Sequence, residues 1–251
     1  MYADGCHLTP RETKFPACVY GVSSSETTVV LFGDSHAMQW FPALNEIAKE
    51  RDWRLVGLSK AACPPAEVLH RYNARLRREY RECDGWRERA LERITRKEDP
   101  SLIVTSMLNR YQAWEDGKRL PRTASNEAVI KGYVSTLEKL RSTGARLAVL
   151  EDVPRVDKDI PQCVSRSLDH LQDCAFSRSK AMGRPRVNAR AAAEVEGATL
   201  IDATPMICPG KMCPAVIGDV LVYRNGSHLT ATYVRTLTPW LAEHLPEPSG
   251  S

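Results

Sequence analysis

The most constraining feature of this sequence is the alternation of short apolar runs with longer amphipathic segments. Five runs have the composition of buried strands: 27–32, 53–58, 101–106, 146–152 and 198–203. Helix-compatible segments lie between and after them: 36–50, 66–97, 125–141, 179–195 and 230–245, the last interrupted at Pro239. Buried strands separated by helices form parallel sheets that carry helices on both faces. The pattern therefore predicts an α/β fold built on a mainly parallel, five-stranded sheet.

The first run ends abruptly in Gly-Asp-Ser-His, within VVLFGDSHAMQW at 29–40. Ligands bind beyond the carboxyl ends of the strands in such a sheet, which puts Ser35 at the binding edge. A helix beginning there offers backbone N–H donors and a positive dipole end to a developing anion. Ser35 is thus either a helix cap or a nucleophile. Asp34 is better explained as a turn and N-cap residue, and His36 as lining a pocket or bonding across the loop.

A serine nucleophile needs a base within hydrogen-bond reach, because its hydroxyl is too weakly acidic to attack an ester unaided. His228 lies in VLVYRNGSHLTATYVRTL, at 220–237, in a short loop before the closing helix. Two helix-entry loops at the same sheet edge can bring Ser35 and His228 together. Taken by itself, His228 is equally explained as a structural loop residue.

The eight cysteines fall into four close pairs, separated by long stretches without cysteine. The economical pairing is local: Cys6–Cys18, Cys63–Cys83, Cys163–Cys174 and Cys208–Cys213. Each bridge would stabilise the fold by about 2–4 kcal/mol. A zinc or thiol-redox protein is the alternative, but zinc sites prefer C-x₂₋₄-C spacing, which only the last pair approaches. We therefore expect disulfides, no metal centre and an extracytoplasmic location.

The charge and hydropathy patterns exclude two classes of partner. The formal net charge of +4 is too small to indicate nucleic-acid binding. No run approaches the roughly 20 apolar residues that a membrane-spanning helix requires. The sequence also lacks a signal peptide, so an extracytoplasmic domain of this kind is expected to be part of a longer protein.

Several motifs occur together along the chain: VVLFGDSHAMQWFPAL (29–44), LSKAACPP (58–65), Cys83-x-x-Trp86, SLIVTS (101–106), IDATPMIC (201–208) and VYRNGSHLTATY (222–233). In this combination the chain resembles the SGNH hydrolase superfamily, and most closely the extracytoplasmic SGNH-like domain fused to acyltransferase-type-3 membrane proteins. The resemblance covers nearly the whole chain and implies a three-layer α/β/α, flavodoxin-like fold. It implies one domain over 1–251, with a disulfide-closed N-terminal extension at 1–26 and a core at 27–247, forming the C-terminal part of a longer membrane protein.

The resemblance also implies roles for individual residues. Ser35 corresponds to the nucleophile that accepts the acyl group and His228 to its general base. The oxyanion hole would combine the N–H of Ser35, the N–H of Ala61 or Ala62 in the loop after the second strand, and the side chain of Asn109.

Asn225 departs from the family pattern, which has an aspartate three residues before the histidine. An aspartate orients the imidazole and stabilises the imidazolium, whereas asparagine brings no charge. Three explanations remain open: a Ser–His dyad oriented by Asn225 or a backbone carbonyl, a carboxylate recruited from elsewhere, or an inactivated domain. We favour the dyad. Tyr111 and Trp114 are candidates either for stacking on a sugar ring or for simple packing.

The implied function is serine-dependent O-acyl transfer, chiefly of acetyl, to a carbohydrate or glycan hydroxyl through an acyl-serine intermediate. Hydrolysis by the same groups would make the domain an acetylesterase. No cofactor is expected in this domain; an upstream transmembrane acyltransferase domain would supply the acetyl group from a donor such as acetyl-CoA and tether the domain at the periplasmic or cell-surface side. Because of Asn225, the alternative is a catalytically impaired module that binds carbohydrate or presents substrate.

Overall fold

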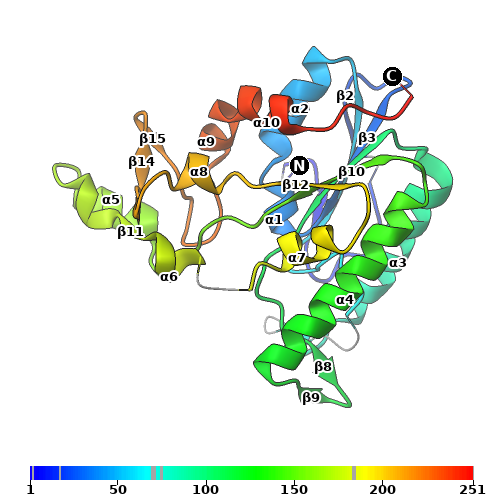
Figure 1. Cartoon of the computed structure of the whole chain (residues 1–251), viewed down its shortest axis with the longest axis horizontal. Helices are drawn as coiled ribbons and strands as arrows, with labels where there is room; N and C mark the ends of the chain where they lie inside the picture. The colour runs from blue at the N-terminus through cyan, green and yellow to red at the C-terminus, as the bar shows by residue number, and fades with distance from the viewer. Residues whose placement is uncertain (2, 17, 69–71, 74–75, 183–184, 251) are drawn as a thin grey trace.

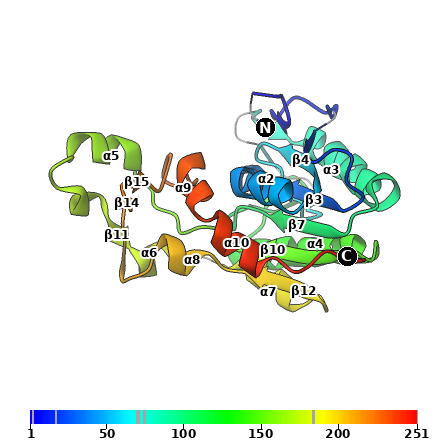
Figure 2. The same ribbon diagram turned by 90° about the horizontal axis from the view of Figure 1, so that it is seen from above.

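The computed structural model describes residues 1, 3–16, 18–68, 72–73, 76–182 and 185–250. Five strands form its centre: β3 (Thr28–Gly33), β4 (Arg54–Lys60), β7 (Leu102–Ser106), β10 (Arg146–Leu150) and β12 (Ala198–Ile201). They run parallel in the order β4-β3-β7-β10-β12 (Figures 1 and 2). The predicted fold class is confirmed, and the first predicted strand lies between the second and the third, as in flavodoxin-like sheets.

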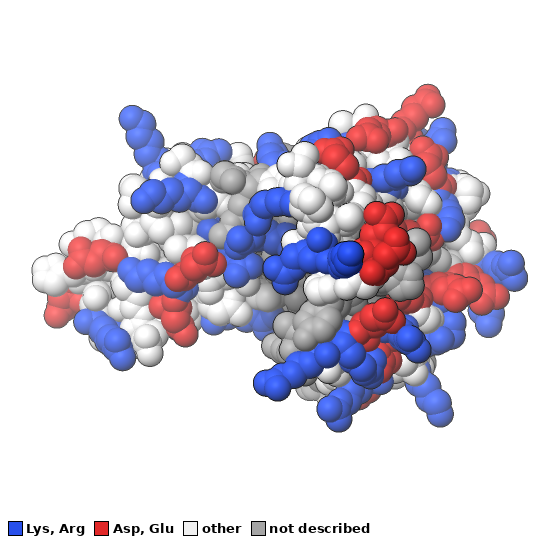
Figure 3. Space-filling view, turned by 90° about the horizontal axis from the view of Figure 1, so that it is seen from below, with Lys and Arg blue, Asp and Glu red and all other residues white. Residues whose placement is uncertain are grey.

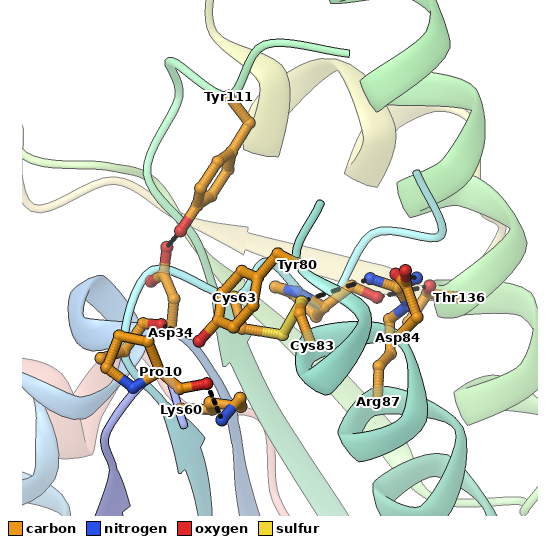
Figure 4. Close-up of a disulfide and its surroundings, with 12 residues drawn as sticks. Pro10, Asp34, Lys60, Cys63, Tyr80, Cys83, Asp84, Arg87, Tyr111 and Thr136 are labelled. Atoms are coloured by element: carbon orange, nitrogen blue, oxygen red, sulfur yellow. Dashed lines mark hydrogen bonds and ion pairs between the residues drawn. A yellow bond between two sulfur atoms is a disulfide. The ribbon is translucent and has the colours of Figure 1, made fainter. Parts of the chain in front are cut away.

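The N-terminal segment adds two short strands that we did not predict. β1 (His7–Leu8) pairs in parallel with the end of β4, and β2 (Val19–Gly21) pairs antiparallel with its beginning. The sheet therefore has seven strands within the described residues. The segment between the two strands is fastened by Lys60, whose buried ammonium donates to the carbonyl oxygens of Thr9, Pro10 and Glu12. Figure 4 shows the contact with Pro10.

Alternate side chains of β3 enter two separate cores, as the pleat of a strand requires. Val29 and Leu31 belong to one core, whereas Val30 and Phe32 belong to the other. The first core includes residues of α1 (Ser35–Met38), α2 (Phe41–Glu50), α9 (Ala231–Thr236) and α10 (Thr238–His244). The second includes residues of α3 (Arg81–Arg93), α4 (Arg122–Arg141) and α7 (Val187–Ala193). Figure 2 shows α9 and α10 beside α2.

Helix boundaries differ from the sequence pattern in several places. The 36–50 segment divides into α1 and α2. Only the second half of 66–97 is helical, as α3 followed by a π-helical turn at Ile94–Glu98. A hairpin of β5 (Tyr72–Asn73) and β6 (Arg78–Glu79) precedes it, and 69–71 and 74–75 lie outside the described residues. The C-terminal segment breaks before Pro239, as predicted, because proline is well placed only in the first turn of α10.

The helix expected over 125–141 begins earlier, at Arg122. Ser125 lies inside this helix, and its hydroxyl accepts from the N–H of Ala113 at 2.7 Å. This contact ties α4 to the hairpin of β8 (Trp114–Glu115) and β9 (Lys118–Arg119). The 179–195 segment divides into α6 (Arg178–Met182) and α7, with 183–184 outside the described residues.

All four predicted disulfides are present: Cys6–Cys18, Cys63–Cys83, Cys163–Cys174 and Cys208–Cys213. The last two lie in a lobe at the left of Figure 1, away from the sheet. Its elements are α5 (Ile160–Arg166), a 3₁₀ turn (Leu171–Cys174), β11 (Phe176–Ser177), α6, α8 (Thr204–Ile207), β13 (Met212–Cys213), β14 (Val216–Ile217) and β15 (Val220–Leu221). None of the helices in the described residues has the length and apolarity needed to cross a bilayer.

Candidate active site

Ser35 stands where β3 meets α1, between the carboxyl ends of β4 and β7. This is the point where the strand order reverses, the usual binding position in such sheets. Gly33 makes the turn possible, because a Cβ there would lie 2.3 Å from the carbonyl oxygen of Ser106. The predicted N-cap role of Asp34 is confirmed, since its Oδ1 accepts from the N–H of His36 at 2.7 Å.

Asp34 also fixes the loop that follows β7. Its Oδ2 accepts from the N–H of Leu108 at 3.0 Å and from the hydroxyl of Tyr111. Figure 4 shows Tyr111 reaching across to this carboxylate. Tyr111 lines the cavity beside Ser35, but its hydroxyl is held by Asp34; Trp114 lies in β8, outside the cavity lining. Of the two aromatic candidates for sugar stacking, only Tyr111 is therefore in place.

The structure brings together the two side chains predicted to form the dyad. Nε2 of His228 lies 2.9 Å from Oγ of Ser35, although 193 positions separate them in the sequence. The backbone N–H of Leu229 donates to the side chain of Gln39 at 2.9 Å, which fixes the histidine loop against the end of α1. The distance is that of a direct hydrogen bond, so His228 is positioned to take the proton of Ser35.

The other ring nitrogen of His228 has neutral partners. Nδ1 lies 3.1 Å from Oγ of Ser227 and 3.3 Å from Oδ1 of Asn225. Since the amide oxygen can only accept, Nδ1 carries the proton, and Nε2 is left with the lone pair that a base needs. Oδ1 of Asn225 also accepts from the N–H groups of Ser227 and His228, at 2.8 and 2.9 Å. Asn225 thus orients the imidazole and shapes its loop, but contributes no charge.

A second imidazole lies directly beside the first. The rings of His36 and His228 are 4.3 Å apart between centroids. His36 is buried and donates from Nδ1 to Oδ1 of Asp152 at 2.6 Å. Both expectations for His36 therefore hold, since it lines the cavity and bonds across the loop.

Asp152 and Glu151 are the site residues that the sequence analysis missed. They follow β10 directly, and both are buried. Oδ2 of Asp152 accepts from the N–H of Asn109 at 2.8 Å. The available signal was a pair of acidic residues at the carboxyl end of an apolar parallel strand. The prediction missed it because it included both residues in the strand of 146–152.

The oxyanion groups are only partly where the resemblance places them. The N–H of Ala61 donates to the carbonyl oxygen of Leu8 at 2.8 Å. Ala62 lines the cavity in a left-handed conformation with φ of 53°. The N–H of Ser35 has no acceptor within the described residues.

Asn109 requires a correction. Its side chain was predicted to complete the oxyanion hole, but it is buried away from the cavity lining. Its Nδ2 donates to Oε1 of Glu151 at 2.6 Å, and its Oδ1 accepts from the N–H of Val187 at 2.8 Å. These bonds join the loop after β7 to α7, because a buried amide must satisfy both its donor and its acceptor. Asn109 supports the site without facing it.

The two histidines differ in electrostatics. Burial lowers the pKa of His228 to about 2, with further contributions from the nearby charges of His36 and Arg224. Burial also opposes the charged form of His36, but the charge and hydrogen bond of Asp152 outweigh it and raise the pKa of His36 above its ordinary value. The surroundings thus shift the pKa values of the two neighbouring histidines in opposite directions, and His228 favours its neutral form.

The dyad opens into a cavity of about 860 Å³. Its walls come from the N-terminal segment, the loops after β3, β4 and β7, and the loop that carries His228. In the part of the chain that the structure describes, no three His, Cys, Asp or Glu side chains are grouped to hold a metal ion.

Comparison with solved structures shows that this fold occurs in other proteins. The periplasmic domain of a lipopolysaccharide acetyltransferase from Salmonella ser. Paratyphi A is similar at a TM-score of 0.66 and 16% identity, covering 96% of this chain and 86% of that one. A carbohydrate acetylesterase family member from Sinorhizobium meliloti is more distant, with a TM-score of 0.45 and 14% identity over 87% of this chain and 99% of that one.

No curated protein sequence matches this chain significantly. The sequence does match, over residues 5–243, the family described as SGNH domain (fused to AT3 domains). This match covers nearly all of the sheet and both loops that meet in the dyad. The chain therefore belongs to the family of SGNH domains that are fused to AT3 domains.

Proposed function

We propose that this domain transfers an acyl group, chiefly acetyl, to a carbohydrate hydroxyl through an acyl-serine intermediate on Ser35. The observation that carries the proposal is the 2.9 Å contact between Oγ of Ser35 and Nε2 of His228 inside a large cavity. The family, and the name of the Salmonella acetyltransferase with the same fold, support this type of chemistry.

In the first half-reaction, His228 takes the proton of Ser35 while Oγ attacks the acyl carbonyl carbon. The oxyanion that forms is stabilised by the N–H of Ser35, which replaces solvation by water. The bond from the acyl carbon to the leaving group breaks, and the imidazolium returns its proton to that group. The products are the acyl-serine and the protonated leaving group.

In the second half-reaction, a carbohydrate hydroxyl gives its proton to Nε2 of His228 and attacks the acyl-serine. The bond to Oγ of Ser35 then breaks, Ser35 regains the proton, and the ester of the sugar leaves. Water in place of the sugar completes the same cycle as hydrolysis, so transfer requires that the acceptor fill the cavity.

The four disulfides favour an oxidising compartment. We therefore place the domain on the extracytoplasmic side, as one unit of a longer membrane-tethered protein whose AT3 domain delivers the acyl group from a donor such as acetyl-CoA. No cofactor takes part within the domain itself.

The absence of a carboxylate next to His228 among the described residues favours a second candidate, a module that binds carbohydrate without turning it over. A fluorophosphonate probe separates the two functions, because it reacts only with an activated serine. We expect labelling of the wild-type protein at Ser35, identified by peptide mass spectrometry, and strong loss of labelling in His228→Ala. His170→Ala, an exposed histidine, is the matched control. Equal labelling rates in wild type and His228→Ala would contradict the enzyme and leave the binding module.

A further inference from the structure

The cavity around the dyad carries an excess of positive charge. Arg110 and Arg224 line it together with Ser35 and His228, whereas no Asp or Glu contributes to its described lining. Figure 3 shows Lys and Arg side chains gathered across the middle of the face seen from below.

Arg155 extends this positive charge beyond the cavity. It lines a smaller hollow together with Arg110, and its Nε is buried without a hydrogen-bond partner in the described part of the chain. Arg110 and Arg155 both approach one carboxylate, that of Asp157, at 4.0 and 3.3 Å. Asp157 is 71% exposed, so water weakens its attraction for both.

These closely spaced positive charges lower the pKa values of neighbouring groups. The pKa of Arg110 is lowered by burial and by the charges of Arg155 and Arg122. Burial, together with the charge of Arg224, lowers the pKa of His7 to about 4. Like charges held together in a partly desolvated cavity cost free energy, and an anion bound between them offsets this cost.

We infer that the cavity binds an acceptor sugar through an anionic group, a carboxylate or a phosphate, held by Arg110 and Arg224 with Arg155 behind them. Guanidinium groups suit both anions because their planar N–H donors form paired, charge-assisted hydrogen bonds. The inference rests on the proposed function only where it makes the sugar an acceptor. The inference itself concerns binding, and its test requires no catalysis.

The test is an NMR titration of the ¹⁵N-labelled protein with glucuronate, glucose 6-phosphate and glucose. We expect at least one of the two anionic sugars to bind about tenfold or more tightly than glucose, as one charge-assisted contact provides. The chemical-shift changes should map to residues of the cavity. The anionic sugar that binds more tightly shows whether the site prefers a carboxylate or a phosphate. Raising the salt concentration should weaken that binding and leave glucose unaffected.

Arg110→Gln should reduce the preference for the anion over glucose by about tenfold. Arg96→Gln is the matched control, since Arg96 is exposed on the π-helical turn after α3 and should keep the preference. Equal affinities for all three sugars, no binding of either anion, or an equal effect of the two substitutions would overturn the inference. Fluorophosphonate labelling of Ser35 in the same samples reports the proposed function separately.

Discussion

The two loops that bring histidines to the cavity place them in opposite electrostatic surroundings. The loop after β3 presents His36 to the buried carboxylate of Asp152, so this imidazole is fixed and favours its charged form. The loop before α9 presents His228 to the cavity, where Nδ1 meets Ser227 and Asn225, both neutral, among the described residues. A hydrogen-bonded pair whose histidine pKa is raised and a histidine whose pKa is lowered thus lie in ring contact. A carboxylate buried near a candidate nucleophile can therefore pair with a different histidine from the one that contacts the serine.

The largest expected effect comes from removing the base. His228→Ala should lower kcat/KM for 4-nitrophenyl acetate by about 10³-fold or more, because general-base catalysis is lost. His36→Ala should cost less than about 10²-fold, since His36 transfers no proton in the proposed reaction. Steady-state kinetics at pH 7.5 with matched circular dichroism spectra measure both. A larger loss in His36→Ala than in His228→Ala would reverse the assignment of the two histidines.

Breaking the buried pair should chiefly affect stability. Asp152→Asn leaves His36 without its charge partner, and we expect about 3 kcal/mol less free energy of unfolding. Urea denaturation at pH 7 measures the change. Glu196→Gln, which alters a 92% exposed carboxylate, should change it by less than about 0.5 kcal/mol. Similar values for the two variants would show that the His36–Asp152 pair adds little to the fold.

Giving the base a charged partner should sharpen the contrast. Asn225→Asp keeps an acceptor for Nδ1 of His228 and adds a negative charge, which raises the pKa of His228 and stabilises its imidazolium. We expect kcat to rise by about tenfold, a fraction of what a triad aspartate provides elsewhere. The acid limb of the pH–rate profile should move to higher pH, because His228 becomes protonated sooner as the pH falls. An unchanged profile between pH 4 and 9 would mean that the added carboxylate does not reach the ring.

The smallest effect concerns the pH dependence of stability. The pKa of His36 is raised in the folded protein, so its contribution is complete below pH 6.5 and is lost as the pH rises through the folded value. We expect the free energy of unfolding to fall by about 1 kcal/mol across this range. His36→Gln should remove that slope, whereas the exposed His170→Gln should keep it. Urea midpoints at pH 6 and pH 9 provide the measurement, and equal slopes in all three proteins would exclude His36 as the cause.

The sequence predicted the five main strands because each is a short run of apolar and β-branched residues, although the edge strand β12 leaves Thr199 and Leu200 exposed. It also predicted the pairing of Ser35 with His228, since both lie in helix-entry loops expected at the same sheet edge. β1 and β2 escaped prediction because strands of two or three residues carry no periodicity. Asn109 was assigned wrongly because its side chain satisfies buried partners from distant segments, which local patterns do not report.

One consequence follows from the anchoring of the N-terminal segment by Lys60. His7, Thr9 and Pro10 form a wall of the cavity, although none of them belongs to the five main strands. A version trimmed to those strands and their helices would keep its serine and histidine. Without this wall, however, the two side chains would be exposed to solvent, and water would reach the ester freely. Such a trimmed protein should therefore favour hydrolysis over transfer, and the choice between the two outcomes would be controlled by a segment that performs no chemistry.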